Sequence, residues 1–289
     1  MLLKELINKG TETISSLYPE REAREMVYAF LEHHIGTKRH THIVEPGYDV
    51  VQKAADEALA AFERMASGEP LQYVTGYADF YGRQFHVTPD VLIPRPETEL
   101  LCREVVTFPH SCQPVLRILD LCTGSGCIAW TLALEMPGAE VTAVDISDGA
   151  LKVASTQDFT EEVSRTGAVP PTFIKVDVLA GPAAVQQKYD VIVSNPPYVM
   201  DKEKELMRTN VLDHEPHLAL FVPDDDPLKF YKAIARHSAR MLSEDGIGIV
   251  EINEALGLET SDLFTAAGFA DVHIESDLSD RHRFVIFRR

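Results

Sequence analysis

The alternation of short apolar runs with helical patterns over residues 96–289 constrains the fold more than any other feature of this chain. Runs rich in β-branched residues occupy 115–121, 140–145, 172–178, 189–194, 246–252, 271–276 and 283–288. Helical patterns lie between most of them, over 126–136, 148–165, 227–243 and 255–267. This order predicts an α/β fold, in which a mostly parallel sheet carries helices on both faces. Polar residues at the ends of such strands meet at one edge of the sheet, where open α/β folds bind ligands.

The N-terminal part of the chain follows other patterns. Residues 1–68 predict a small helical domain, because apolar side chains recur at helical spacing over 23–31 and Gly36 can end that helix. Residues 69–95 are rich in aromatic and β-branched residues and are interrupted by glycine and proline, which predicts a β-hairpin linker. We therefore expect a third part, 96–289, to form the α/β domain.

Composition limits the classes of partner. The chain has 27 Lys and Arg against 45 Asp and Glu, a net charge of −18, which argues against a bulk nucleic-acid binder but leaves a local basic patch open. No apolar stretch is long enough to span a membrane, and the polar start "MLLKELINKG" indicates a cytoplasmic protein. His214 and His217 have a conceivable metal-ligand spacing but no supporting cluster, so we expect no metal. Without a CxxC pair, reduced thiols are expected at Cys102, Cys112, Cys122 and Cys127.

A glycine-rich turn follows the first strand of the α/β part, in "LDLCTGSGCIA" (119–129). Gly124 and Gly126 allow the backbone to approach a ligand closely. Alone, such a loop could bind a dinucleotide, a phosphate or nothing, and both the full GxGxxG fingerprint and a GK[ST] ending are absent. The candidate ligand-binding residues of this loop are Cys122, Thr123, Gly124, Ser125 and Gly126.

The next two strands also end in carboxylates. Asp145 ends "VTAVD" and can accept both ribose hydroxyls of a nucleoside, or it can cap the following helix, a role open also to Ser147 or Asp148. Asp177 ends the third strand and can reach an adenine amino group, with Val178 against the ring. Three such signals in this order predict a nucleoside site.

The fourth strand ends in "NPPY", Asn195 to Tyr198. Taken alone, the motif could be a stiff strand-ending turn, because proline cannot continue the ladder. Together with Asp120, the glycine loop, Asp145 and Asp177, it resembles class I S-adenosylmethionine-dependent methyltransferases that act on amino or amide nitrogens. Such enzymes have a Rossmann-like fold with a mostly parallel seven-stranded sheet.

Two further stretches narrow the resemblance. "EPLQYVTGYADFYG" (69–82) and "VLIPRPETELL" (91–101) are similar to the HemK/PrmC family, and the likeness extends over nearly the whole chain. The family often has glycine where Cys122 stands. The resemblance implies methylation of the N5 amide nitrogen of the GGQ-motif glutamine in peptide chain release factors, with S-adenosylmethionine as donor and S-adenosylhomocysteine as product. It also implies a role for Arg283 that the sequence does not define.

The resemblance assigns substrate chemistry to the NPPY motif. The Asn195 side-chain oxygen and the Pro196 carbonyl can accept the two hydrogens of the target amide, Pro197 stiffens the turn, and Tyr198 can pack against the flat amide. Because an amide nitrogen is a poor nucleophile, orientation supplies most of the catalysis. No His or Glu beside Asn195 is an obvious general base. We expect a monomer whose helical domain recognises the protein substrate.

Several alternatives remain open at this point. The chain could be an adenine N6-methyltransferase acting on nucleic acid, or a cofactor-binding scaffold without catalysis. Residues 199–226 are long and polar and predict a flap over the site, or a disordered surface loop. Arg95 and Glu97 could shape the pocket, hold the hinge or form a structural ion pair, and Phe80 and Tyr81 could be hairpin core or pocket wall.

Overall fold

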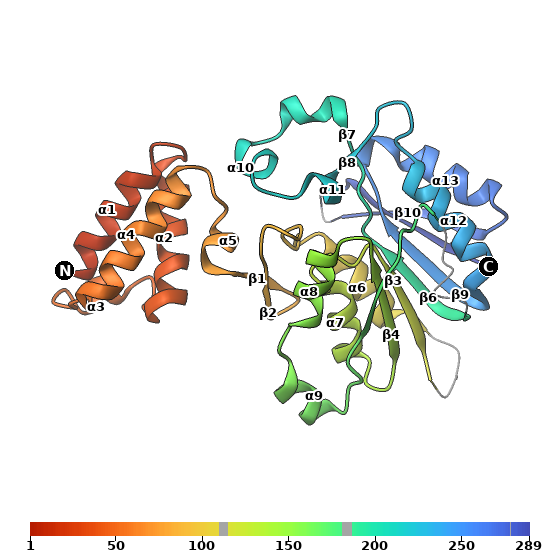
Figure 1. The fold of residues 1–289 in the computed structure, drawn as a ribbon, viewed down its shortest axis with the longest axis horizontal. Coiled ribbons are helices and arrows are strands. Elements are labelled where there is room, and N and C mark those ends of the chain that lie inside the picture. Colours follow the sequence, from red (N-terminus) through yellow and green to blue (C-terminus); the bar gives the residue numbers. More distant parts are fainter. Residues whose placement is uncertain (110–114, 181–186, 278) are drawn as a thin grey trace. The chain divides into compact units, whose positions relative to one another are not determined.

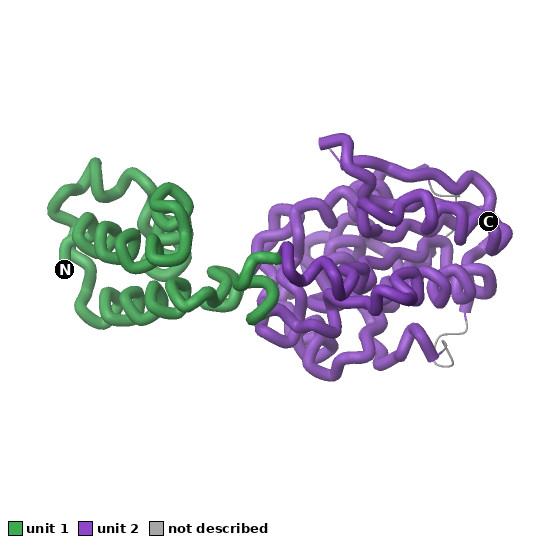
Figure 2. The backbone as a smooth tube through the Cα atoms, turned by 90° about the horizontal axis from the view of Figure 1, so that it is seen from above, with its two compact units in different colours: residues 1–77, 207–214 green, residues 78–206, 215–289 purple. Residues whose placement is uncertain are grey.

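The computed structural model describes residues 1–109, 115–180, 187–277 and 279–289, so Cys112 lies outside the described residues. The chain forms two compact units, coloured separately in Figure 2. The helical unit comprises residues 1–77 and 207–214, and the sheet unit comprises 78–206 and 215–289. The three-part division at residues 68 and 95 stays a prediction.

The helical unit has a hydrophobic core of its own. It contains α1 (Leu3–Ile14), α2 (Glu20–Ile35), α3 (Thr41–Val44), α4 (Gln52–Ala66) and α5 (Leu71–Thr75). Helix α2 ends at Ile35, and the predicted stop at Gly36 is confirmed, because Gly36 follows the helix with a left-handed φ of +69°. A Cβ at Gly10 would lie 2.5 Å from Phe62 Cε2, so glycine at this position permits the close approach of α1 to α4.

A segment distant in sequence completes the helical unit. Residues Met207–His214, with α10 (Thr209–Leu212), group with residues 1–77. Within this unit, Arg208 Nη1 lies 3.1 Å from Glu22 Oε1 on α2. The segment is therefore part of the helical unit although both its chain neighbours belong to the sheet unit.

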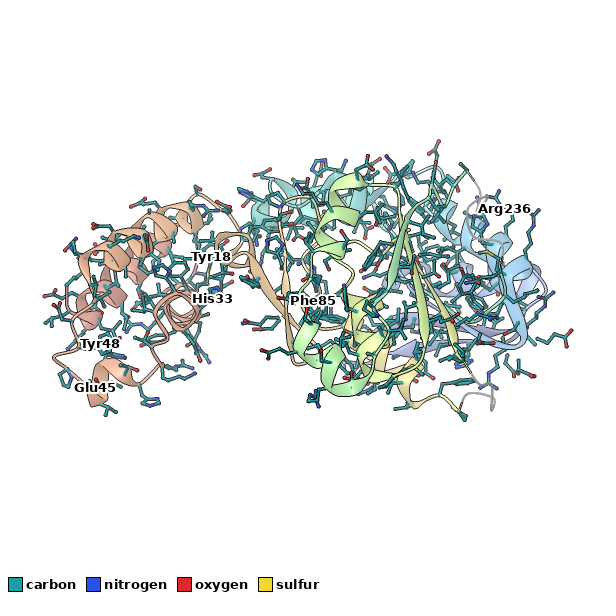
Figure 3. The ribbon with its side chains drawn as sticks, turned by 60° about the horizontal axis from the view of Figure 1, so that its bottom comes forward. Tyr18, His33, Glu45, Tyr48, Phe85 and Arg236 are labelled. Carbon is teal, nitrogen blue, oxygen red and sulfur yellow. The ribbon has the colours of Figure 1, made fainter. Side chains whose placement is uncertain are left out.

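A two-stranded sheet, β1 (Tyr77–Phe80) and β2 (Arg83–His86), lies where the hairpin linker is predicted. Its turn residues Tyr81 and Gly82 both have positive φ, +50° and +73°, which is typical of a tight type I′ turn. Phe85 points from β2 into the core of the sheet unit, where its ring centroid lies 5.0 Å from that of Phe159 (Figure 3). Phe80 is also buried there, so it is core rather than pocket wall.

The central sheet has seven strands in the order β10-β11-β9-β6-β3-β4-β5. The strands are β3 (Arg117–Leu121), β4 (Glu140–Asp145), β5 (Thr172–Lys175), β6 (Tyr189–Ser194), β9 (Leu242–Glu251), β10 (Ala270–Ser276) and β11 (His282–Arg288). Neighbours from β9 through to β5 pair in parallel, whereas β11 is antiparallel to both β9 and β10. The predicted mostly parallel, seven-stranded α/β sheet is confirmed, and Figure 1 shows its strands among the helices.

Alternate side chains of the strands pack on opposite faces of this sheet. Ile118 and Val191 belong to one core with α6 (Thr98–Thr107) and α7 (Cys127–Glu135). Leu119 and Ile192 belong to a second core with α12 (Lys229–Met241) and α13 (Gly257–Ala266). The period-two alternation of the strands thus fixes which helices cover which face.

Two predicted elements differ from the structure. The single helix predicted over 148–165 is two helices, α8 (Asp148–Ser155) and α9 (Thr160–Thr166). Between them, the buried Gln157 side chain accepts the His86 N–H at 2.9 Å and donates to the His86 and Ser125 carbonyls. The break between the two helices allows the Gln157 side chain to make these contacts. The strand predicted over 172–178 ends at Lys175, so Asp177 lies in the turn that follows.

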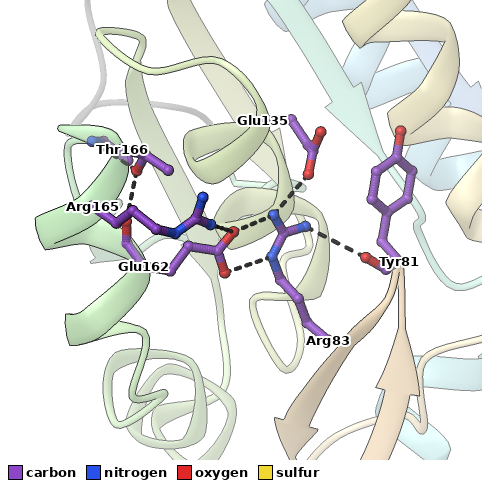
Figure 4. A network of polar contacts seen from close by, with 7 residues as sticks. Tyr81, Arg83, Glu135, Glu162, Arg165 and Thr166 are labelled. Carbon is purple, nitrogen blue, oxygen red and sulfur yellow. Dashed lines mark hydrogen bonds and ion pairs between the residues drawn. The ribbon is translucent and has the colours of Figure 1, made fainter.

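Arg83 joins the hairpin to the helices of the sheet unit (Figure 4). Its guanidinium contacts Glu162 through two nitrogens, at 3.0 and 2.6 Å, and Glu135 at 2.7 Å. The Arg83 side chain is only 12% exposed. Its hydrogen bonds to Glu162 hold the pKa of that carboxyl below its usual range.

Short elements occupy most of the predicted flap, 199–226. Strands β7 (Val199–Met200) and β8 (Phe221–Val222) pair in parallel, with η1 (Asp201–Leu206) and α11 (His217–Leu220) between them. The remaining short helix is η2 (Glu254–Leu256). In the part of the chain that the structure describes, no helix is long and apolar enough to cross a membrane.

Candidate functional site

A cavity of about 220 Å³ opens at the carboxyl ends of the parallel strands of the sheet unit. It is lined by most of the residues predicted for ligand binding: Cys122, Thr123, Gly124, Ser125, Asp145, Asp177, Val178, Asn195 and Pro197. The candidate residues Gly126, Pro196 and Tyr198 are described but are not among its lining residues. The four strand-end motifs therefore meet at one site, as expected from the parallel order of the strands.

The glycine loop has positive φ at three positions. Cys122 has φ +64°, which costs a side chain strain that glycine would not have. A Cβ on Gly124 would meet nothing within 4 Å, so the space beside it is open to a ligand. A Cβ on Gly126 would lie 3.0 Å from Ala154 Cβ, so glycine there serves the packing of α7 against α8. Glycine is therefore required at the two positions for different reasons, at Gly124 to leave space for a ligand and at Gly126 to allow helix packing.

Asp145 shapes the glycine loop from the neighbouring strand. Its Oδ2 accepts the Gly124 N–H and its Oδ1 accepts the Ser147 N–H, both at 2.9 Å. Burial raises the pKa of Asp145, and these backbone hydrogen bonds oppose the rise. Ser147 caps α8, because its Oγ accepts the Ala150 N–H at 3.1 Å. Asp145 is therefore not that cap, and its remaining lone pairs can face a ligand.

Asp120 lies fully buried beneath this loop. Its Oδ2 accepts the Thr123 hydroxyl at 2.6 Å. Burial raises its pKa to about 7, which the Thr123 hydrogen bond opposes and the nearby Asp145 charge favours. Asp120 thus supports the loop from below rather than lining the cavity.

The turn after β5 is held from α12. Asp177 Oδ1 accepts the Leu179 N–H at 2.8 Å, which closes the turn. His237 Nε2 donates to the Val178 carbonyl at 2.7 Å. Arg236, labelled in Figure 3, donates to the Leu179 carbonyl at 3.1 Å. These bonds fix the apolar side of the cavity, where Val178 is buried.

A buried polar network lies behind the NPPY motif. Asn195 Nδ2 donates to Thr98 Oγ1 at 3.1 Å, and the Thr98 hydroxyl donates to Glu251 Oε2 at 2.7 Å. Tyr198 OH donates to the other oxygen of Glu251 at 3.0 Å. The sequence analysis missed both Thr98 and Glu251. Glu251 ends an apolar strand, the same signal that identified Asp145 and Asn195.

The flap contributes one rim of the cavity. Pro216, Leu218 and Ala219 line it, and Leu218 is 60% exposed. Arg95 Nη2 lies 2.6 Å from Oε1 of the buried Glu215, whose Oε2 accepts the Ile93 N–H at 3.1 Å. Arg95, itself a lining residue, therefore anchors the flap end to the 91–95 segment.

This arrangement can hold two different ligands side by side. The Gly124 and Asp145 edge offers open backbone and a carboxylate, which suit a nucleoside with free hydroxyls. The Asn195 edge offers an oriented amide, which suits a planar nitrogen group. No group of three or more His, Cys, Asp or Glu side chains that could hold a metal occurs within the described ranges.

The chain is similar to known methyltransferases over most of its length. Residues 98–218 match the family described as methyltransferase small domain, and residues 5–76 match the PrmC N-terminal domain. A release factor glutamine methyltransferase from Flavobacterium psychrophilum is 37% identical over 289 residues, 99% of this chain and 98% of that protein. One from Bacteroides thetaiotaomicron is 42% identical over 226 residues, 78% of each chain. The hMettl16 catalytic domain in complex with MAT2A 3'UTR hairpin 6 shares the fold, with a TM-score of 0.54 at 14% identity over 82% of each chain.

Proposed function

Because the chain belongs to the family of release factor glutamine methyltransferases, we propose that it transfers a methyl group from S-adenosylmethionine to the N5 side-chain amide nitrogen of a glutamine in a peptide chain release factor. The target is the glutamine of the GGQ motif. One observation carries the proposal: Asn195, whose side chain has the chemistry to bind an amide, lines the same cavity as Gly124 and Asp145. An enzyme with this substrate acts in the cytoplasm and serves translation termination.

The residues present fit the cofactor. Asp145 accepts the ribose hydroxyls, Val178 packs on the adenine, and Asp177 accepts its amino group. Gly124 supports this assignment, because its missing side chain leaves open space beside the loop. Thr123 and Ser125, both lining residues, complete the loop that holds the amino-acid end. S-adenosylmethionine supplies, when bound, an electrophilic methyl carbon.

The NPPY motif holds the substrate amide. Asn195 Oδ1 accepts one amide hydrogen and the Pro196 carbonyl accepts the other, which turns the nitrogen lone pair toward the methyl group. Tyr198 stiffens the motif through its bond to Glu251. Holding reactants in this way can contribute up to roughly 7–11 kcal/mol, whereas one hydrogen bond contributes about 1 kcal/mol, so positioning dominates.

The helical unit recognises the release factor as a folded protein, and the chain works as a monomer without binding nucleic acid. In support, the helical unit exposes adjacent apolar side chains, Ile43 at 68% and Val44 at 69%. We expect Ile43→Ser combined with Val44→Ser to raise KM for intact release factor, while a short peptide around the target glutamine is methylated as before. Equal loss on both substrates would contradict this assignment.

The proposed function is tested with labelled S-adenosylmethionine offered to release factor, to DNA and to no substrate. Label is expected only in release factor, and it should vanish when the target glutamine is replaced by asparagine. Label in DNA would favour adenine methylation, and no label anywhere would favour a non-catalytic scaffold.

Asn195→Ala tests the chemistry assigned to the motif. Cofactor affinity should stay within about threefold, and the single-turnover rate should fall on the order of 10²-fold because the amide is no longer oriented. Methylation at the wild-type rate would leave NPPY as a stiff turn only.

A further inference from the structure

The carboxylate of Glu251 connects two residues of the NPPY motif from behind. Glu251 ends β9, beside β6, and is only 1% exposed. One oxygen receives the hydroxyl of Thr98 and the other receives that of Tyr198, at 2.7 and 3.0 Å. Burial raises the pKa of Glu251, and the two hydrogen bonds and the charge of Arg283 oppose the rise.

The direction of these bonds determines how Asn195 faces the cavity. The Thr98 hydroxyl has a single proton, and it donates that proton to Glu251 Oε2. Thr98 Oγ1 can then only accept, and it takes a hydrogen from Asn195 Nδ2 at 3.1 Å. This fixes the NH2 end of Asn195 against Thr98 and leaves its oxygen as the end available to a ligand.

We infer that Thr98 and Glu251 are positioning residues that select the productive orientation of the Asn195 amide. The inference rests on the proposed function, in which Asn195 Oδ1 holds the substrate amide. Without the relay, the Asn195 side chain can turn over, and its NH2 would then face the NH2 of the substrate, donor against donor.

The surrounding bonds indicate that the turn itself is held independently of Thr98. Asn253 Nδ2 donates to the Tyr198 carbonyl at 3.1 Å and to Glu203 Oε2 at 2.9 Å. The same Glu203 oxygen accepts the Met200 N–H at 2.7 Å. Removing the Thr98 hydroxyl should therefore change the orientation of Asn195 while the backbone of the motif stays in place.

A matched pair of variants tests the relay. Thr98→Val keeps the shape of the side chain but removes the hydroxyl, whereas Thr98→Ser keeps the hydroxyl. We expect Thr98→Val to lower kcat about tenfold, with KM for release factor and cofactor affinity within twofold of wild type. Thr98→Ser should keep kcat within about threefold. Equal kcat in both variants, or a loss confined to KM or cofactor affinity, would overturn the inference.

A double variant separates positioning from general structural support. If Thr98 acts through Asn195, adding Thr98→Val to Asn195→Ala should lower kcat by less than twofold further. A further tenfold loss in the double variant would show that Thr98 acts elsewhere and would overturn the relay.

A measurement without substrate keeps this test distinct from that of the proposed function. The side-chain NH2 signal of Asn195 in ¹⁵N NMR spectra of the cofactor-bound protein is assigned by its absence in Asn195→Ala. It should shift in Thr98→Val and stay in place in Thr98→Ser. If the wild-type chain methylates no release factor, the proposed function fails, and this signal alone decides the relay. An unshifted signal in Thr98→Val would overturn it.

Discussion

Replacement of Asp145 by asparagine tests the cofactor pocket with the smallest change of shape. The wild-type carboxylate accepts the Gly124 and Ser147 N–H groups with different oxygens, both at 2.9 Å. An asparagine has one oxygen, so it can satisfy only one of these donors, and its NH2 must face the other. Because a hydrogen bond to a charged group contributes ~1.5–3 kcal/mol, we expect the free energy of unfolding to fall by about that amount.

The same substitution should weaken cofactor binding. Under the proposed function the ribose hydroxyls would lose their charged acceptor, and the Gly124 loop would lose one of its anchors. A loss of ~1.5–3 kcal/mol corresponds to a roughly 10- to 150-fold rise in Kd for S-adenosylmethionine. Asp145→Ala, which removes both acceptors, should weaken binding by at least tenfold as well.

Titration calorimetry with S-adenosylmethionine and urea unfolding of the same samples measure both effects. Asp148→Asn is the matched control, because Asp148 is 79% exposed and its carboxylate pairs with Lys175 in an exposed salt bridge. Its affinity and stability should equal those of wild type. An Asp145→Asn affinity within twofold of wild type would refute the assignment of this carboxylate to the ribose.

Further substitutions test other parts of the site and its support. Gly124→Ala and Gly126→Ala should both lower the melting temperature, because both glycines have positive φ. Gly124→Ala also places a Cβ in the open space beside the loop and should raise the cofactor Kd, whereas Gly126→Ala, with its Cβ against Ala154, should lower the melting temperature further; calorimetry that shows the same rise in Kd for both would contradict this. Asp120 has a folded pKa of about 7 against 3.8, so the folded state binds its proton more tightly and stability falls as pH rises between about 4 and 7. Urea unfolding should therefore show a smaller fall over that range for Asp120→Asn, and identical slopes would argue against a buried titrating carboxyl. Arg83→Met removes the contacts to two glutamates and should destabilise the sheet unit by ~1–3 kcal/mol at neutral pH, allowing for partial exposure. Because Arg83 lowers the pKa of Glu162, this loss of stability should become smaller as pH falls below about 4 and Glu162 takes up its proton. A pH-independent difference in unfolding would count against the ion pair with Glu162.

The strands and most helices could be predicted because burial requires apolar runs of the right period. The break between α8 and α9 could not, since it depends on Gln157 reaching the backbone of β2, a contact between residues far apart in the chain. The early end of β5 has a similar origin, because His237 and Arg236 of α12 donate to the carbonyls of Val178 and Leu179 in the turn that follows. Local patterns do not contain such tertiary contacts.

The cavity was predictable for the same reason as the sheet. Asp145 and Asn195 follow strands whose parallel order brings them together. Glu251 also ends a strand, but its importance depends on β9 lying beside β6, and strand order is not visible in the sequence. Thr98 begins a helix, where a hydroxyl has many ordinary roles.

The return of Met207–His214 to the helical unit means that this unit is assembled from two separate pieces of the chain. Cutting the chain after residue 77 would leave the larger fragment still carrying one piece, with Arg208 deprived of Glu22. Residues 1–77 grafted onto another enzyme would likewise lack the second piece of the helical unit, Met207–His214. A substitution in one piece that alters their shared packing must therefore be matched in the other, although 129 residues of chain separate the two pieces.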